Sequence, residues 1–124
     1  MKLLRSVSLP TSSTALKRVN VLFEDKILKL STDDIEVEED VEIIEAKGLL
    51  MLPGAIDPHT HILTQDSENA SDLSRFTKIA LEGGYTTLAE LSYHTLNPIF
   101  DNRSLKKKMA FINANSFTSM ALWG

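Results

Sequence analysis

The chain has 124 residues, of which 43% are hydrophobic and 24% charged, a balance typical of one ordinary soluble globular domain. It contains no cysteine, which excludes disulfides and thiolate metal sites, so any metal ion must be held by nitrogen and oxygen ligands. The net charge of −4 argues against a nucleic-acid partner, because binding to a phosphate backbone requires a basic surface.

Nothing in the sequence predicts a membrane partner or export. No apolar run reaches the roughly 20 residues that are needed to cross a bilayer. The first residues, MKLLRSVSLPTSS, lack the continuous apolar stretch of about 7–15 residues that a secretory signal contains. We therefore expect a cytoplasmic location as the default.

The first half of the chain is expected to form short strands. Runs rich in β-branched and aromatic residues favour strands, and they occupy residues 19–23, 26–30 and 41–46. Glu24 and Asp25 predict a tight hairpin between the first two runs, and Lys47–Gly48 predicts a turn. The acidic stretch from Asp33 to Asp40 is interpreted as a solvated loop or edge rather than a cation site.

The second half alternates between strand and helix patterns. After a break at Pro53–Gly54, these patterns follow one another at residues 55–61, 71–81, 86–91, 102–113 and 117–123. Such alternation predicts a parallel sheet with helical crossovers, and hence the α/β class. A closed eight-stranded barrel of this kind needs roughly 250 residues, so only three of its strands fit here. We expect one domain at residues 1–52 and a second at residues 53–124.

The two expected helices carry further signals. Ser71 or Asp72 is expected to cap the first helix, and Gly83–Gly84 to end it. The second helix carries a basic cluster, which we interpret as a solvated face. Its members are Arg103, Lys106, Lys107 and Lys108.

The stretch that carries chemistry is Asp57-Pro58-His59-Thr60-His61. Side chains of a strand alternate between its faces, so Asp57, His59 and His61 are expected to point the same way. Two imidazoles at this spacing can bind one metal ion, and they end a strand, where parallel barrels hold their reactive groups. A histidine pair alone is only moderately specific, because two half-exposed strand histidines would give the same pattern. The flanking Pro-Gly break, helix and Gly-Gly turn make the pattern more specific.

These segments carry a resemblance to a known family. Residues 49–61, LLMLPGAIDPHTH, resemble the opening of the amidohydrolase superfamily, in the group of dihydropyrimidinases, hydantoinases, allantoinases and dihydroorotases. Residues 81–91, LEGGYTTLAEL, are similar to the second barrel strand of that group, and the ending SMALWG to its third. The resemblance implies that residues 53–124 begin a (β/α)8 barrel of the TIM type. It also implies that residues 1–52 form part of a small β-sandwich.

The resemblance implies hydrolysis of a cyclic amide at a metal centre, often of two zinc ions, in a homo-oligomeric complete protein. His59 and His61 match the first-strand metal ligands of the family. A bridging carboxylated lysine, two more histidines and an aspartate come from later strands of the family's barrel. Lys78 and Lys106–Lys108 lie on expected helices and do not match the bridging lysine. The chain is therefore expected to be an incomplete amino-terminal piece, inactive alone, without catalytic residues of its own.

Departures from the family pattern leave the substrate-binding residues unknown. Dihydroorotases usually carry an arginine two positions after the second histidine, where this chain has Leu63. The motif around the histidines therefore resembles that of hydantoinases and dihydropyrimidinases more. Glu90 and residues 92–98 differ from the usual end of the second strand. His94 is interpreted as a surface histidine and Trp123 as a core residue. Two alternatives stay open: a non-catalytic dihydropyrimidinase-related interaction protein and a dihydroorotase-like enzyme.

Overall fold

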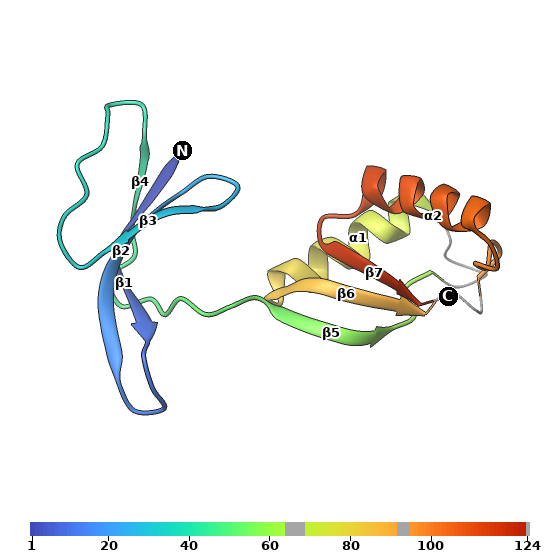
Figure 1. The fold of residues 1–124 in the computed structure, drawn as a ribbon, viewed down its shortest axis with the longest axis horizontal. Helices are drawn as coiled ribbons and strands as arrows, with labels where there is room; N and C mark the ends of the chain where they lie inside the picture. The colour runs from blue at the N-terminus through green and yellow to red at the C-terminus, as the bar shows by residue number, and fades with distance from the viewer. Residues whose placement is uncertain (64–68, 92–94, 124) are drawn as a thin grey trace. The chain divides into compact units, whose positions relative to one another are not determined.

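The computed structural model describes residues 1–63, 69–91 and 95–123 (Figure 1). The chain divides into two compact units, Met1–Pro53 and Gly54–Gly124, each with a sheet of its own. The first contains strands alone and the second alternates strands with helices, so the chain as a whole is mixed α/β. Within the described ranges, no helix is long and apolar enough to cross a membrane.

The first unit is a four-stranded sheet with the order β3-β2-β1-β4. Its strands are β1 (Lys2–Pro10), β2 (Leu16–Phe23), β3 (Ile27–Ser31) and β4 (Glu42–Glu45). β1 pairs with β2 and β2 with β3 in antiparallel fashion, whereas β4 runs parallel to β1. The hairpin expected between β2 and β3 is confirmed, with the amide of Glu24 donating to the carbonyl of Lys26. The acidic stretch lies in a loop, as expected, but Ile35 within it is buried.

β1 is the element that the sequence patterns did not single out, and a bulge explains why. The pairing moves from Leu4 opposite Val21 to Val7 opposite Val19, so β1 carries one extra residue there. Ser6 in this bulge has φ 59°, in the left-handed region, and its amide donates to Oδ1 of Asn20. The extra residue breaks the period-two alternation by which a strand is recognised in sequence.

The second unit contains a three-stranded parallel sheet with the order β5-β6-β7. Its elements are β5 (Ala55–Thr60), α1 (Ala70–Glu82), β6 (Tyr85–Leu91), α2 (Asn102–Asn115) and β7 (Ser119–Trp123). All five expected elements are present. Both helices lie on the same side of the sheet (Figure 1).

The caps of the two helices come from polar residues just before them. Asn69, rather than Ser71 or Asp72, caps α1, and its Oδ1 accepts a hydrogen bond from the amide of Asp72. Asp101 caps α2 by accepting from the amide of Ser104 at 2.7 Å. The backbone hydrogen bond from Ser104, followed by the bond from its hydroxyl, lowers the pKa of the Asp101 carboxyl from its usual range.

The core of the second unit lies between the helices and the sheet. Leu73 of α1 and Ile112 of α2 are buried with Leu63, and Met120 and Leu122 of β7 pack against them. This is the single-faced burial expected for helices that cross over a parallel sheet.

The opposite face of this sheet is open. Ile56 of β5 and Ser119 of β7 are both paired with Thr87 of β6, so the three side chains lie on the same face of the sheet. Trp123 lies four residues after Ser119 on β7 and therefore shares this face. Ile56 is 67% exposed and Trp123 is 60% exposed. The expectation that Trp123 is a core residue is therefore wrong, and Ile56 is exposed as well. Both lie on the face that the helices do not cover.

Candidate metal centre

His59 and His61 meet at the carboxyl end of β5. β5 ends at Thr60, so His59 is its penultimate residue and His61 follows the strand directly. Their Nε2 atoms are 3.1 Å apart, with ring centroids at 5.0 Å and an interplanar angle of 69°. Both side chains are exposed.

This spacing fits two ligands of one ion. Two nitrogens bound at about 2.0–2.1 Å to a tetrahedral zinc ion lie roughly 3.3 Å from each other. A hydrogen bond between one protonated and one unprotonated ring nitrogen would give a similar distance. In either state the two Nε2 atoms lie close together, as two ligands of a shared cation must.

The strict alternation expected across residues 57–61 does not hold. Asp57 pairs with Leu88 and Thr60 with Glu90, so three residues of β5 lie opposite two of β6. The carboxylate of Asp57 accepts a hydrogen bond from the amide of His59. The irregularity lies between Asp57 and Thr60, so Asp57 need not point to the same side as the two histidines. The histidines themselves still converge at their Nε2 atoms.

Glu90 is a neighbour of the histidine pair to which the sequence alone assigned no role. Its side chain is 0% exposed, and its two oxygens accept three hydrogen bonds from the chain around His61. The donors are the hydroxyl of Thr60 at 3.0 Å, the amide of Ile62 at 2.8 Å and the amide of Leu63 at 2.9 Å. A buried carboxylate is costly unless it is hydrogen-bonded, and these bonds supply that compensation. They also hold the backbone that follows His61 and the side chain of Thr60 that precedes it.

The two-residue repeat of side chains along strand β6 could have indicated that Glu90 is buried. Glu90 lies two positions after the buried Leu88 on β6, so it shares the covered face of the strand. A buried carboxylate at such a position needs hydrogen-bond donors nearby. The backbone amides just after the end of the neighbouring parallel strand can supply them, because the strand ladder no longer uses them.

Leu63 belongs to the core and not to the space beside the histidines. It is 1% exposed and packs with Leu73 and Ile112. In this conformation, position 63 does not present a side chain to a substrate.

The other residues considered in the sequence lie apart from the pair. Within the described ranges, no group of three or more His, Asp or Glu side chains is arranged to hold a metal ion. Lys78 lies on α1 and Lys106–Lys108 on α2, as expected. His94 falls outside the described residues. The two imidazoles are thus chemically suited to zinc, but they supply only part of the three or four protein ligands that a zinc site uses.

Comparisons with known proteins point to one group of enzymes. No family model matches the chain. A dihydroorotase from Pyrococcus horikoshii is 30% identical over 99 residues, which cover 80% of this chain and 23% of that protein. An allantoinase from Rubrobacter xylanophilus is 35% identical over 83 residues, covering 67% of this chain and 18% of that protein.

Solved structures agree with these relatives. An L-hydantoinase (dihydropyrimidinase) from Arthrobacter aurescens matches with a TM-score of 0.78 and 25% identity, over 99% of this chain and 27% of that one. A D-hydantoinase (dihydropyrimidinase) from Thermus sp. matches with a TM-score of 0.70 and 20% identity, over 98% of this chain and 27% of that one.

The chain is thus related to the amidohydrolases. Within them, its relatives form the group of dihydroorotases, allantoinases and hydantoinases, as the sequence motifs predicted. The chain spans less than a third of the length of these proteins.

Proposed function

We propose that this chain takes part in the metal-dependent hydrolysis of a cyclic amide, with His59 and His61 as two ligands of a zinc ion. The observation that carries the proposal is the 3.1 Å approach of the two Nε2 atoms at the carboxyl end of a parallel strand. Relatives named dihydroorotase, allantoinase and hydantoinase support the reaction class. The complete protein would hold two such ions and would be a homo-oligomer.

We further propose that β5, β6 and β7 are the first three strands of a (β/α)8 barrel, and that residues 1–52 belong to a β-sandwich. The parallel order of these strands supports the barrel, as do the helices on one face of the sheet. The uncovered face with Ile56 and Trp123 also supports it, because the inner face of a barrel is filled by side chains from all of its strands.

The residues of this chain have a defined part in such a reaction. A metal ion held by the two imidazoles would lower the pKa of a water molecule and polarise the amide carbonyl. His59 and His61 would orient the ion through their Nε2 atoms. Glu90 would hold the backbone around His61 in the conformation that keeps these atoms together.

Metal binding by matched variants tests the ligand assignment. We expect the 124-residue chain to bind Zn²⁺ in calorimetric titrations. The substitutions His59→Ala and His61→Ala should each weaken binding by at least about ten-fold, because each removes one of two nitrogen ligands. His94→Ala is the control, since it removes the third histidine of the chain. Retention of wild-type affinity in both His59→Ala and His61→Ala would contradict the assignment.

The ring that is cleaved depends on groups beyond the two histidines. Leu63 is buried, which argues against recognition of a carboxylate by this position. Assays of the chain alone with dihydrouracil, hydantoin and allantoin should show no turnover, because two ligands do not complete a zinc site. Measurable hydrolysis by the chain alone would overturn the view that further ligands are needed.

A further inference from the structure

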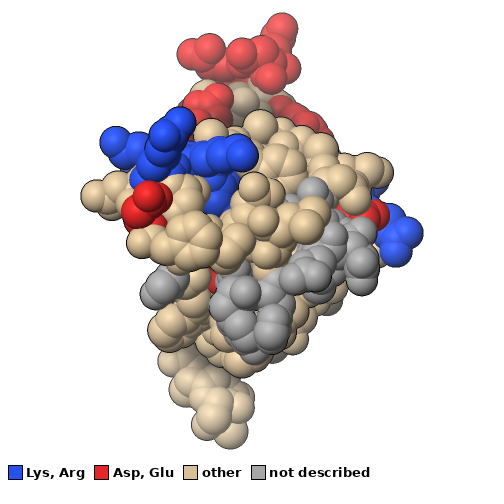
Figure 2. Space-filling model, turned by 90° about the vertical axis from the view of Figure 1, so that its right-hand side faces the viewer, with Lys and Arg blue, Asp and Glu red and all other residues tan. Residues whose placement is uncertain are grey.

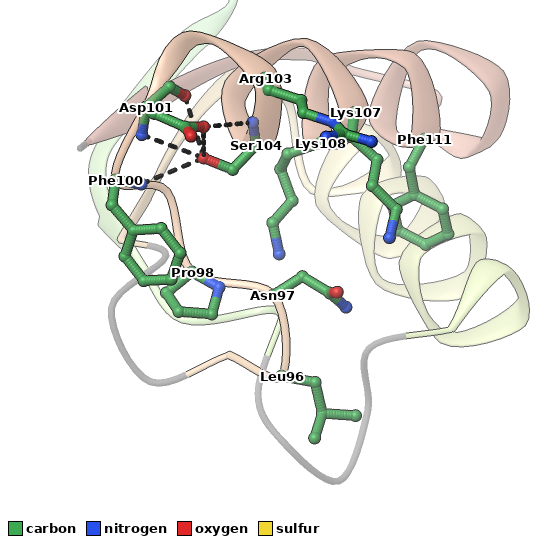
Figure 3. A pocket seen from close by; sticks show the side chains of 10 residues that line it. All are labelled: Leu96, Asn97, Pro98, Phe100, Asp101, Arg103, Ser104, Lys107, Lys108 and Phe111. Carbon is green, nitrogen blue, oxygen red and sulfur yellow. Dashed lines mark hydrogen bonds between the residues drawn. The ribbon is translucent and has the colours of Figure 1, made fainter.

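A pocket of about 410 Å³ lies in the second unit, between the segment 96–100 and the first turns of α2 (Figure 3). One part of its wall is apolar and comes from Leu96, Pro98, Phe100 and Phe111. Another part is basic and comes from Arg103, Lys107 and Lys108 of α2. Its volume falls within the range of about 300–1,000 Å³ that is usual for small-molecule sites.

Arg103 and Lys107 bring like charges to the same side of α2. They are four residues apart, so their side chains are neighbours on the helix surface, an arrangement that destabilises a helix. Neither takes part in a salt bridge with any residue in the described ranges. Figure 2 shows a large group of Lys and Arg side chains and a separate smaller one, and the larger group agrees with the basic sequence of α2.

Lys108 adds a third positive charge from inside the wall. It is 3% exposed, so the expectation that all four basic residues form a solvated face is wrong for this one. Its Nζ lies 3.2 Å from Oγ1 of Thr95, and Figure 3 shows its side chain directed from α2 toward Asn97.

Within the described part of the chain, the acidic residue of the lining forms no salt bridge with Arg103 or Lys107. Asp101 is engaged in capping α2, where it accepts from the amide and the hydroxyl of Ser104. The first turn of α2 contains no acidic residue, and the cations in the amino-terminal half of the helix oppose its dipole. A bound anion beside Arg103 and Lys107 would offset the repulsion between them.

We propose that this pocket binds a small organic carboxylate with an apolar body. The carboxylate would lie against Arg103 and Lys107, because a guanidinium forms paired hydrogen bonds with such a group. The apolar body would contact Phe100 and Leu96. The proposal does not depend on the metal site, because none of the lining residues belongs to it.

Binding of benzoate to the full chain, measured by calorimetry, tests the proposal. Benzamide is the neutral analogue of the same shape, and inorganic phosphate is an anion without an apolar body. We expect saturable binding of benzoate, and binding of both comparison compounds that is weaker by about ten-fold or more. Absence of saturable benzoate binding, or equal binding of benzamide or phosphate, would overturn the proposal.

Substitutions on α2 locate the site. Arg103→Gln and Lys107→Gln should each weaken benzoate binding by about five-fold or more, since each removes a charge from the lining. Lys106→Gln is the matched control, because Lys106 is exposed on the same helix but does not line the pocket. Circular dichroism would verify that the variants keep their fold. An equal loss in Lys106→Gln would indicate general electrostatic attraction and would overturn the proposed site.

Discussion

The hydroxyl of Thr60 donates a 3.0 Å hydrogen bond to the buried carboxylate of Glu90, and so joins the ends of β5 and β6 between the two histidines. The same carboxylate accepts from the amides of Ile62 and Leu63. The backbone that follows His61 is therefore held by a side chain from the neighbouring strand. We therefore expect this relationship to restrict the movement of the segment that carries His61.

Glu90→Gln tests this relationship. Either orientation of the new amide places an NH₂ group against an N–H or O–H donor, so we expect a loss of about 1–3 kcal/mol in the free energy of unfolding. Urea denaturation followed by circular dichroism measures it. Glu82→Gln, at the exposed end of α1, is the control and should change stability by less than about 0.5 kcal/mol. A Glu90→Gln variant as stable as wild type would show that these hydrogen bonds do not hold the segment.

The cap of α2 should give the chain an acid-sensitive element. The pKa of Asp101 is lowered from its usual 3.8 by the hydrogen bonds from Ser104, so the folded state favours the ionised form. Its contribution to stability is complete above pH 3.8 and is lost as the pH falls through the lowered pKa. Asp101→Asn keeps a capping oxygen but does not titrate.

We therefore expect the stability of Asp101→Asn to depend less on pH than that of wild type below the usual aspartate pKa. Thermal melts across this range measure the difference. Asp101→Ala serves as the comparison, because it removes the cap at every pH. Parallel curves for wild type and Asp101→Asn would rule out the ionised cap as the cause.

Gly54→Ala should disturb the start of β5. A Cβ at this position would overlap the side chain of Thr86. We expect a loss of about 1–3 kcal/mol in the free energy of unfolding, the usual cost of overpacking. The double variant Gly54→Ala with Thr86→Ala should recover part of this loss, because it removes two of the overlapping atoms. A fully stable single variant would mean that the two strands separate there at little cost.

The uncovered face of the second sheet should make the chain self-associate. Ile56 and Trp123 are both more than half exposed there, and exposed apolar surface of this kind favours association. Size-exclusion chromatography of the chain should show aggregates or a partly folded species. Ile56→Asn should reduce the associated fraction. A compact wild-type monomer that melts cooperatively would contradict this prediction.

Much of the fold could be predicted from the sequence because its signals are local. The Gly83–Gly84 stop and the apolar spacing around Leu73 specify α1, and the runs that became β2 and β3 were found for the same reason. The His59–His61 pair was found because alternate positions of a strand share a face, and the flanking Pro-Gly break, helix and Gly-Gly turn made the pattern more specific. Asn69 was missed as a cap, since Ser71 and Asp72 close to it are also residue types that cap helices.

The features that could not be predicted depend on contacts between distant residues. The bulge at Ser6 depends on Asn20, fourteen residues away, and it conceals β1 from any period-two pattern. Glu90 finds its donors 27 to 30 residues earlier in the chain. Trp123 has a large aromatic side chain of the kind that is usually buried. Its exposure follows only from which face of the sheet the helices cover.

The single tryptophan gives this molecule an internal optical probe. The indole Nε1 of Trp123 donates to the carbonyl of Pro58 at 3.3 Å, next to His59 in the chain. A shift in strand β5 when the imidazoles take up a cation would alter that hydrogen bond and the water around the ring. The fluorescence of the unlabelled protein can therefore follow events at the histidine pair.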